Sequence, residues 1–473
     1  MKTYQWSSAS LITLFFLISC SCERQARRVD PSPSASEPVE IARDAGAGVD
    51  VDDQPADMSA PPQGNTATRP PGELTGFFQV LEETARGRAV RVLHIGDSHV
   101  ASDLMTGQLR RAFQGRFGEA GRGYVYAGKP WRHFRMEGVS YSMSKGWSRY
   151  NARGTTPGPF GFGGTRLVTD EEDATITRGA SEEDGAPFVM ARISFLTDPL
   201  GGSFEVTDSS GDFSRVFSTG GDEVEVASID VVFPEPVTEL MVRAVGDGPI
   251  TLLGTSTRSG QGGVIYDALG LNGATARTFL RVEEEHARAE LAMFAPDLII
   301  ITLGTNDIYN LRKKELLPEH RDEAEAGFVG LLARHKAAAP EAACVLMLPM
   351  DVMRKPRRKR CNTDQREAGL CDWTRIEAAE LIEQVMRDVA AEHGCALWDA
   401  RAAMGGPASI LGWAAREPAL AGKDGVHLRK LGYQMLGDAL FADLMDAFSR
   451  FEAGEDATLK TTVIELPELE EQE

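Results

Sequence analysis

The chain lacks three features that often identify a class of protein: an excess of basic charge, CxxC pairs of cysteines and long apolar runs. Its 473 residues carry a net charge of −20, which disfavours a nucleic-acid-binding protein. Its six cysteines include no CxxC pair, which argues against a zinc site, and we expect neither a metal nor another cofactor. With 42% hydrophobic and 25% charged residues, most of the chain should still be globular.

The apolar run Leu11–Ile18 is too short to span a bilayer, but it has the length of a signal-peptide core. It leads into Ser19 and Cys20, and this end resembles a bacterial lipobox, in which Cys20 is lipidated and becomes the mature N-terminus. A plain secretory signal or a short membrane anchor is the alternative. With Ser21 next, the resemblance implies a periplasm-facing lipoprotein, anchored in the outer membrane of a Gram-negative bacterium.

Export to an oxidising compartment would allow the remaining cysteines to pair. Cys361 and Cys371 lie in one polar loop and would close a short ring. Cys344 and Cys395 each begin an apolar, strand-like run, and neighbouring parallel strands could bring them together. Four cysteines allow three connectivities, so both pairs are hypotheses at this point.

Composition and periodicity divide the chain into segments. Residues 1–22 are the predicted signal peptide, and residues 23–72, rich in Pro, Ala, Ser, Asp and Gly, are predicted to be a disordered linker. Over residues 73–130 and 263–450, buried apolar runs alternate with amphipathic helices. This alternation predicts an α/β fold with a parallel sheet covered by helices on both faces, a three-layer α/β/α core. Residues 451–473 form an acidic tail that we expect to be mobile.

Residues 131–262 interrupt this alternation. They are rich in Gly, Ser, Thr, Val and Phe, and segments such as Phe188–Phe195 and Glu239–Val245 have the alternating pattern of strands. Several short strands with frequent turn signals predict a β-sandwich. Because α/β segments precede and follow it, we expect this region to be an insertion.

The first predicted strand, Ala89–Ile95, runs into Gly96-Asp97-Ser98-His99 directly before a helix. A serine on such a turn lies at the carboxyl edge of the sheet, and the helix N-terminus favours developing negative charge. Ser98 is therefore a candidate nucleophile. The GxSxG signature of other hydrolases is absent, because Val100 replaces its last glycine. Taken alone, a Ser and an Asp before a helix are more often a helix N-cap.

Two further turns follow apolar runs. In Gly270–Thr275, a glycine such as Gly273 would let the backbone approach a ligand closely, although a simple turn would look the same. In Gly304–Asp307 (GTND), the amide of Asn306 could donate to an oxyanion, and the alternative is an ordinary Asx turn.

A fourth turn, Asp424–Leu428, precedes the last predicted helix. Its DxxH spacing allows one short loop to supply both a base and the carboxylate that orients it. His427 would take the proton of Ser98, and Asp424 would hold the imidazole in the correct tautomer. We expect the other seven histidines to be ordinary core or surface residues.

The four turns, in this order, resemble blocks I, II, III and V of the SGNH (GDSL-like) hydrolase superfamily. The resemblance covers about residues 89–130 and 263–450. It implies a flavodoxin-like core and a metal-independent serine esterase whose oxyanion is held by the N–H groups of Ser98 and Gly273 and by the Asn306 amide. The residues that correspond to the family's name are Ser98, Gly273, Asn306 and His427.

A closer resemblance rests on the GDSH start, the long insertion and the run Tyr266–Ala274. These features are similar to bacterial peptidoglycan O-acetylesterases, which carry a carbohydrate-binding-like module at this place. The resemblance implies an acetylated glycan substrate, no nucleic-acid partner, contact with a membrane only through the lipid anchor, and a monomer. An O-acetyltransferase, an esterase for another polysaccharide or a lipid, and a non-catalytic glycan-binding lipoprotein remain alternatives, the last disfavoured by the complete residue set.

One basic cluster, Arg354–Arg360, follows the apolar strand that ends near Pro349. It should lie on the same side of the sheet as the four turns, where it could attract anionic polymers. A solvated loop tied by Cys361 and Cys371 is the simpler interpretation.

Overall fold

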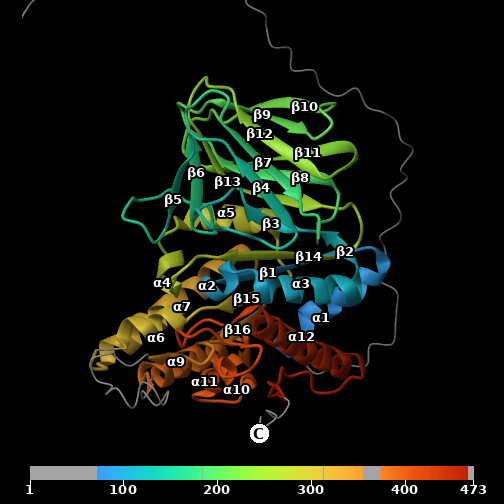
Figure 1. The fold of residues 1–473 in the computed structure, drawn as a ribbon. Coiled ribbons are helices and arrows are strands. Elements are labelled where there is room, and N and C mark those ends of the chain that lie inside the picture. The colour runs from blue at the N-terminus through green and yellow to red at the C-terminus, as the bar shows by residue number, and fades with distance from the viewer. Residues whose placement is uncertain (1–71, 184, 313, 355–372, 467–473) are drawn as a thin grey trace, which may run out of the picture. The chain divides into compact units, whose positions relative to one another are not determined.

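The computed structural model describes residues 72–183, 185–312, 314–354 and 373–466 (Figure 1). The predicted signal peptide with Cys20, almost all of the predicted linker, the pair Cys361–Cys371 and the basic cluster beyond Arg354 lie outside the described residues. Among the helices of the described part, none combines the length and the apolar character needed to cross a bilayer.

A six-stranded parallel sheet forms the centre of the α/β part, with the strand order β19-β16-β15-β1-β14-β2. The strands are β1 (Ala89–Gly96), β2 (Glu119–Gly121), β14 (Gly263–Gly270), β15 (Leu298–Thr302), β16 (Ala343–Leu348) and β19 (Ala396–Asp399). Strand β1 lies between β14 and β15. The predicted α/β class with a parallel sheet is therefore confirmed.

Both faces of this sheet are buried, because successive side chains of a strand point to opposite faces. In β1, Val90 and Val92 enter one apolar cluster, and Leu93 and Ile95 enter another on the opposite face. The first cluster is completed by α1 (Thr75–Glu82), α3 (Leu104–Phe117) and α12 (Lys430–Glu452). The second is completed by α5 (Glu284–Phe294), α7 (Pro318–Ala338) and α9 (Ala378–His393).

Shorter elements follow the strand ends or connect the longer helices. They are η1 (Glu83–Arg86), α2 (Ser98–Ala101), α4 (Ala276–Phe279), α6 (Thr305–Leu311), α10 (Ala400–Ala403), α11 (Ser409–Ala414) and the antiparallel pair β17 (Met353–Arg354) and β18 (Thr374–Arg375). Two of the short helices, α2 and α6, begin directly after β1 and β15 and therefore lie at the carboxyl edge of the sheet.

Between β2 and β14 the chain forms two antiparallel sheets, drawn in green above the parallel sheet in Figure 1. We call residues 123–258 the β region. One sheet has the order β10-β9-β12-β7-β4 and the other β11-β8-β13-β6-β5, with β3 also paired to β13. The strands are β3 (Gly123–Tyr126), β4 (Val139–Met143), β5 (Ser148–Asn151), β6 (Thr165–Thr169), β7 (Thr175–Ala180), β8 (Phe188–Leu196), β9 (Ser203–Asp208), β10 (Ser214–Ser218), β11 (Val226–Val237), β12 (Glu239–Ala244) and β13 (Ile250–Arg258).

Alternating burial explains why these segments form strands with one covered face. In β12, Leu240, Val242 and Ala244 are buried while the residues between them are partly exposed. They join a separate apolar cluster that includes Phe195 and Phe204. The antiparallel strands begin at Gly123, earlier than the expected start at residue 131, because β3 pairs with β13 and not with the parallel sheet.

The β region is also packed onto the α/β part. Tyr124, Tyr126 and Phe160 belong to the same apolar cluster as Leu269 of β14. The Tyr126 hydroxyl donates to the carbonyl oxygen of Gly270, at the end of β14, over 3.0 Å. The end of a central strand is thus held directly by a side chain of the β region.

The expectation of a mobile acidic tail is wrong for residues 453–466. Leu459 is buried against the apolar cluster of α1 and α12. The backbone N–H of Thr462 donates to Asp443, and the Thr461 hydroxyl accepts from the backbone N–H of Asp399. A few apolar and hydroxyl residues among the acidic ones are enough to attach this segment. Residues 467–473 lie outside the described part.

One helix is longer than its apolar periodicity indicated. The apolar spacing of residues 324–338 predicts a helix over that range, but α7 begins at Pro318. Proline is favoured in the first turn, where its missing N–H is not needed and its φ angle suits a helix. The first turns of α7 are largely exposed, so hydrophobic spacing could not locate them.

Candidate active site

The ends of β1, β14 and β15 lie side by side at the carboxyl edge of the parallel sheet. Gly96 pairs with Gly270 on one side and with Thr302 on the other. After β1 the chain first extends the sheet through β2 and β14, and it then crosses to the other side of β1 with β15. Such a switch point is the usual position of a ligand site in parallel α/β sheets. Ser98, Gly273 and Asn306 each follow one of these three strands.

Ser98, His427 and Asp424 form a continuous hydrogen-bonded chain at this edge. The Oγ atom of Ser98 lies 2.9 Å from Nε2 of His427, although the two residues are 329 positions apart in sequence. On the other side of the imidazole, Nδ1 of His427 lies 2.7 Å from Oδ2 of Asp424. The His427 side chain is 46% exposed, so the chain opens to solvent. This geometry allows the imidazole to accept the hydroxyl proton while the carboxylate holds its other nitrogen.

The loop before α12 is folded so that Asp424 faces His427. The Oδ1 atom of Asp424 accepts the backbone N–H groups of Val426 and His427, both over 3.0 Å. Gly425 between them has a φ angle of +73°, and a side chain there would collide with Trp373 and with the Met353 carbonyl. Partial burial raises the pKa of Asp424, but the hydrogen bonds from His427 and Val426 outweigh it and leave the pKa below its ordinary value. Asp424 therefore stays ionised beside the imidazole.

Asp97 is a buried carboxylate next to the candidate nucleophile. Its side chain accepts the backbone N–H of His99 over 3.0 Å and so caps helix α2. Burial raises the pKa of Asp97 to about 7, against the opposing effects of the His99 N–H, the nearby His427 and the Asn306 amide. The N-cap interpretation of the GDSH turn thus holds for Asp97, and it leaves the Ser98 hydroxyl free to meet His427.

His99 is buried behind His427 and takes part in positioning the loop. Its Nδ1 atom lies 2.8 Å from the Tyr433 hydroxyl, and its ring centroid lies 5.4 Å from that of His427. Burial, reinforced by the neighbouring His427, lowers the pKa of His99 to about 3. His99 is therefore a neutral packing partner of His427, consistent with the expectation of a core histidine.

The Asn306 amide is already engaged by protein groups. Its Nδ2 atom donates to Oδ2 of Asp97 over 3.1 Å and to the carbonyl oxygen of Ala274 over 3.0 Å. Both amide hydrogens are thus used, so donation to an oxyanion would require one of them to exchange partners. Asn306 lies at the predicted edge, and it ties the end of β1 to the turn after β14.

Gly273 lies in the turn after β14 with a φ angle of +75°, which favours glycine. An added Cβ atom would lie 2.6 Å from Nη1 of Arg153, a residue that follows β5 in the β region. The Arg153 guanidinium donates to the neighbouring carbonyl oxygen of Asn272 over 2.8 Å. Sequence reasoning missed Arg153, because no local pattern connects it to residues more than a hundred positions away.

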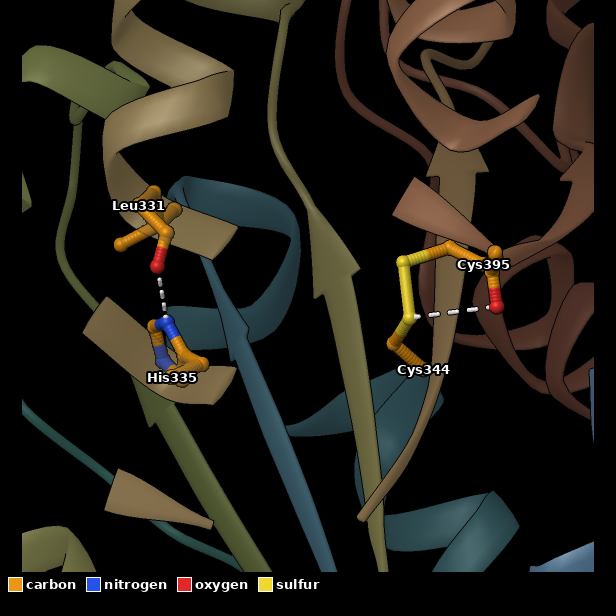
Figure 2. Close-up of a disulfide and its surroundings, with 5 residues drawn as sticks. Leu331, His335, Cys344 and Cys395 are labelled. Atoms are coloured by element: carbon orange, nitrogen blue, oxygen red, sulfur yellow. Dashed lines mark hydrogen bonds between the residues drawn. A yellow bond between two sulfur atoms is a disulfide. The ribbon is translucent and has the colours of Figure 1, made fainter. Parts of the chain in front are cut away.

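The two cysteines predicted to pair within the sheet lie away from this edge. Cys344 and Cys395 are joined in a disulfide, which Figure 2 shows between β16 and the start of β19. Val345 pairs with Ala396, so the adjacent parallel strands bring the two cysteines together. These residues are at the amino ends of the strands, at the edge opposite to Ser98. Within the described ranges, no group of three or more His, Cys, Asp or Glu side chains is arranged to hold a metal ion.

A comparison with protein families matches one segment of the chain. Residues 246–435 match the model of the GDSL-like lipase/acylhydrolase family. The matched segment includes Gly273, Asn306, Asp424 and His427, whereas Ser98 precedes it and is brought to them by the fold. Residues 246–435, less than half of the chain, are therefore similar to a family of lipases and acylhydrolases, and an ester hydrolase is the class of enzyme that this similarity supports.

Among solved structures, the chain shares its fold with one described as a peptidoglycan O-acetylesterase in action. The match has a TM-score of 0.64 and 23% sequence identity, and it covers 79% of this chain and 96% of the other. An acetyl xylan esterase, AlAXEase, matches with a TM-score of 0.25 and 17% identity over 37% of this chain and 77% of the other. The acetylxylan esterase Axe2 from Geobacillus stearothermophilus matches with a TM-score of 0.26 and 22% identity over 37% and 70%. A search of curated proteins returned no match.

Proposed function

We propose that this hydrolase is a peptidoglycan O-acetylesterase that uses Ser98 as its nucleophile. The observation that carries the proposal is the hydrogen-bonded chain from Ser98 through His427 to Asp424 at the switch point of the sheet. A hydroxyl, an imidazole and an ionised carboxylate in this order form the arrangement that serine hydrolases use. The GDSL-like family match supports ester hydrolysis as the reaction.

In the proposed reaction the Ser98 oxygen attacks the acetyl carbonyl, and its proton passes to Nε2 of His427. The tetrahedral intermediate collapses as His427 protonates the leaving sugar oxygen, which leaves an acetyl group on Ser98. Water then attacks this acetyl-enzyme, gives its proton to His427, and releases acetate and free Ser98. Asp424 holds the imidazole in the tautomer that accepts at Nε2 and stabilises the imidazolium.

The proposed oxyanion donors are the backbone N–H groups of Ser98 and Gly273 and the Asn306 amide. The N–H of Ser98 lies at the start of helix α2, where the helix dipole favours negative charge. Asn306 would exchange its bond to Asp97 or to Ala274 for a bond to the oxyanion. The pKa of Asp97, raised to about 7 by burial, supports such an exchange, because a protonated carboxyl is a weaker acceptor for the amide.

An acetylated glycan is proposed as the substrate on two grounds. The structural match to a peptidoglycan O-acetylesterase extends over 79% of the chain, which is more than the α/β part. The β region lies directly against the turn that contains Gly273, through Arg153 and Asn272, so a glycan bound by it would reach the site.

We also propose that the protein is a periplasm-facing lipoprotein anchored through Cys20. Labelled palmitate should be incorporated into the wild type and not into C20A.

The proposal predicts that S98A loses at least about a thousandfold in kcat on a neutral acetyl ester such as p-nitrophenyl acetate. The matched control is S102A in the same turn, whose hydroxyl only donates to the His99 carbonyl and whose loss should leave kcat within about twofold. Full residual activity of S98A would rule out the proposed nucleophile.

Substrate and acceptor are tested by product analysis with the wild-type enzyme. Acetate release from O-acetylated peptidoglycan should exceed release from acetylated xylan. Faster release from xylan would assign another polysaccharide substrate. Transfer of the acetyl group to an added glycan acceptor, without free acetate, would make the protein an O-acetyltransferase with the same nucleophile.

A further inference from the structure

Arg153 places a cation of the β region on the turn that follows β14. The residue comes two positions after the end of β5, and its own backbone N–H donates to Oδ1 of Asn151 over 3.1 Å. Its Nη1 atom donates to the carbonyl oxygen of Asn272 over 2.8 Å. Within the part of the chain that the structure describes, no carboxylate forms an ion pair with this guanidinium. Within these residues the Arg153 side chain therefore donates to the backbone oxygen of Asn272 and not to a carboxylate.

The carbonyl that Arg153 binds belongs to the same peptide unit as the Gly273 N–H. A trans peptide is planar, and its C=O and N–H bonds point in opposite directions. A hydrogen bond that fixes the direction of the Asn272 oxygen therefore also fixes the direction of the Gly273 N–H. Because the donor is charged, it also polarises the peptide and makes that N–H a stronger donor.

The surrounding contacts leave this peptide little freedom to rotate. On the following residue, the Ala274 carbonyl accepts the Asn306 amide over 3.0 Å. On the preceding side, the buried side chain of Leu271 lies beside Gly164, against which Ala152 is also packed. The guanidinium lies over Gly273 itself, at the position a Cβ atom would take. Arg153 thus holds the turn from the β region while Asn306 holds it from the α/β part.

We propose that Arg153 is a positioning residue that orients and polarises the Gly273 N–H for the oxyanion. This inference rests on the proposed function, in which that N–H is an oxyanion donor. It assigns the β region a role in the chemical step in addition to any binding of substrate. It also explains the glycine, because both the positive φ angle and the guanidinium above it exclude a side chain.

The test compares R153A and R153Q with the control R215A on a neutral acetyl ester, which offers no charge for an arginine to recognise. Arg215 is an exposed arginine of the same region, on β10, whose guanidinium lies over the Phe213 ring. R153A should lower kcat about tenfold with KM within about twofold, and R153Q, which keeps a neutral donor, about threefold. R215A should match the wild type. Acetylation of Ser98 and hydrolysis of the acetyl-enzyme both pass through an oxyanion. The kcat of R153A should therefore fall whichever of these two steps limits the rate.

Free guanidinium added to R153A should restore part of the lost kcat and have no effect on R215A. A purely structural role for Arg153 would not give this rescue. Wild-type kcat in a folded R153A, or in R153Q where R153A does not fold, would overturn the inference. A rise in KM for acetylated peptidoglycan with unchanged kcat on the neutral ester would assign Arg153 to substrate binding and overturn it as well. These outcomes can be told apart from a failure of the proposed function. An active S98A would overturn the proposed function, whereas an R153A with wild-type kcat would overturn only the role of Arg153.

Discussion

The α/β part and the β region differ in how their strands are buried and in how they contribute to the site. Strands of the parallel sheet are covered on both faces, so β15 is buried at every residue. Several strands of the β region alternate between buried and partly exposed residues, as in β12, so only one of their faces is covered. The parallel sheet brings three short motifs to one edge because β1, β14 and β15 all end there, and the loop before α12 brings the fourth. The β region has no such motif, and it reaches this edge through single side chains, Tyr126 at the end of β14 and Arg153 at the turn that follows. Sequence motifs therefore reveal what the parallel sheet contributes to the site but not what the β region contributes.

The largest effect that tests this comparison is on stability. Phe204 is fully buried in the apolar cluster of the β region, with its ring centroid 5.6 Å from that of Phe195. F204A should lower the free energy of unfolding by about 3–5 kcal/mol, as large-to-small changes in a core do. The folded fraction should keep its kcat, because Ser98, His427 and Asp424 all belong to the α/β part. Chemical denaturation and activity per folded molecule measure the two effects.

V216A is the matched control for this change, since Val216 is on β10 and is 60% exposed. It should change the free energy of unfolding by no more than about 0.5 kcal/mol. A collapse of kcat in folded F204A would mean that the two regions are coupled through more than Arg153, and the division of roles drawn above would be wrong.

The next effect is on the chemical step and concerns a residue of the α/β part. N306A removes the proposed amide donor, and we expect kcat to fall about a hundredfold with little change in KM. Because the amide also binds Asp97 and Ala274, a loss of about 1 kcal/mol in stability should accompany it. N310A, one helical turn later on the exposed side of α6, should leave kcat unchanged. If N306A keeps full kcat, the amide has only the structural role of joining two turns.

The third effect is a pH dependence that two buried carboxyls share, and it appears only on the alkaline side. Burial raises the pKa of Asp97 to about 7, and burial likewise raises the pKa of Glu290 to about 7. Glu290 accepts the Tyr124 hydroxyl and the Phe162 N–H, where α5 meets the β region. Each group keeps a proton in the folded state that the unfolded chain releases at its ordinary, lower pKa. Its stabilising contribution is complete below that ordinary pKa and is lost as the pH rises toward 7.

D97N and E290Q should therefore each be more stable than the wild type above pH 7, by about 3–4 kcal/mol, with the difference vanishing near pH 4. Denaturation of the three proteins over this pH range measures the effect. Only D97N should also change kcat, because Asp97 contacts Asn306 and Glu290 does not contact the site. An advantage independent of pH would show that the carboxyls are not held protonated by burial.

Several features of the fold were predictable from local pattern. The apolar run over residues 297–303 and the GDSH and DxxH turns define strand ends and loops without reference to the rest of the chain. The start of α7 at Pro318 was not, because its first turns are largely exposed and show no apolar spacing. The attachment of residues 453–466 was not either, because it depends on surfaces that distant segments provide. The engagement of the Asn306 amide by Asp97 and Ala274 also needed the structure, since it joins three separate turns.

By itself, the sequence determined the class of fold, the candidate nucleophile Ser98 and the pair Asp424 and His427, because each depends on residues that are neighbours in the chain. The tertiary structure alone decided that the Ser98 hydroxyl meets His427 across 329 positions and that Asp97 is buried beside them. It also decided that Arg153 lies on the peptide before Gly273. Such contacts join segments that are far apart in the chain, within the α/β part and between it and the β region, and no local pattern encodes that packing.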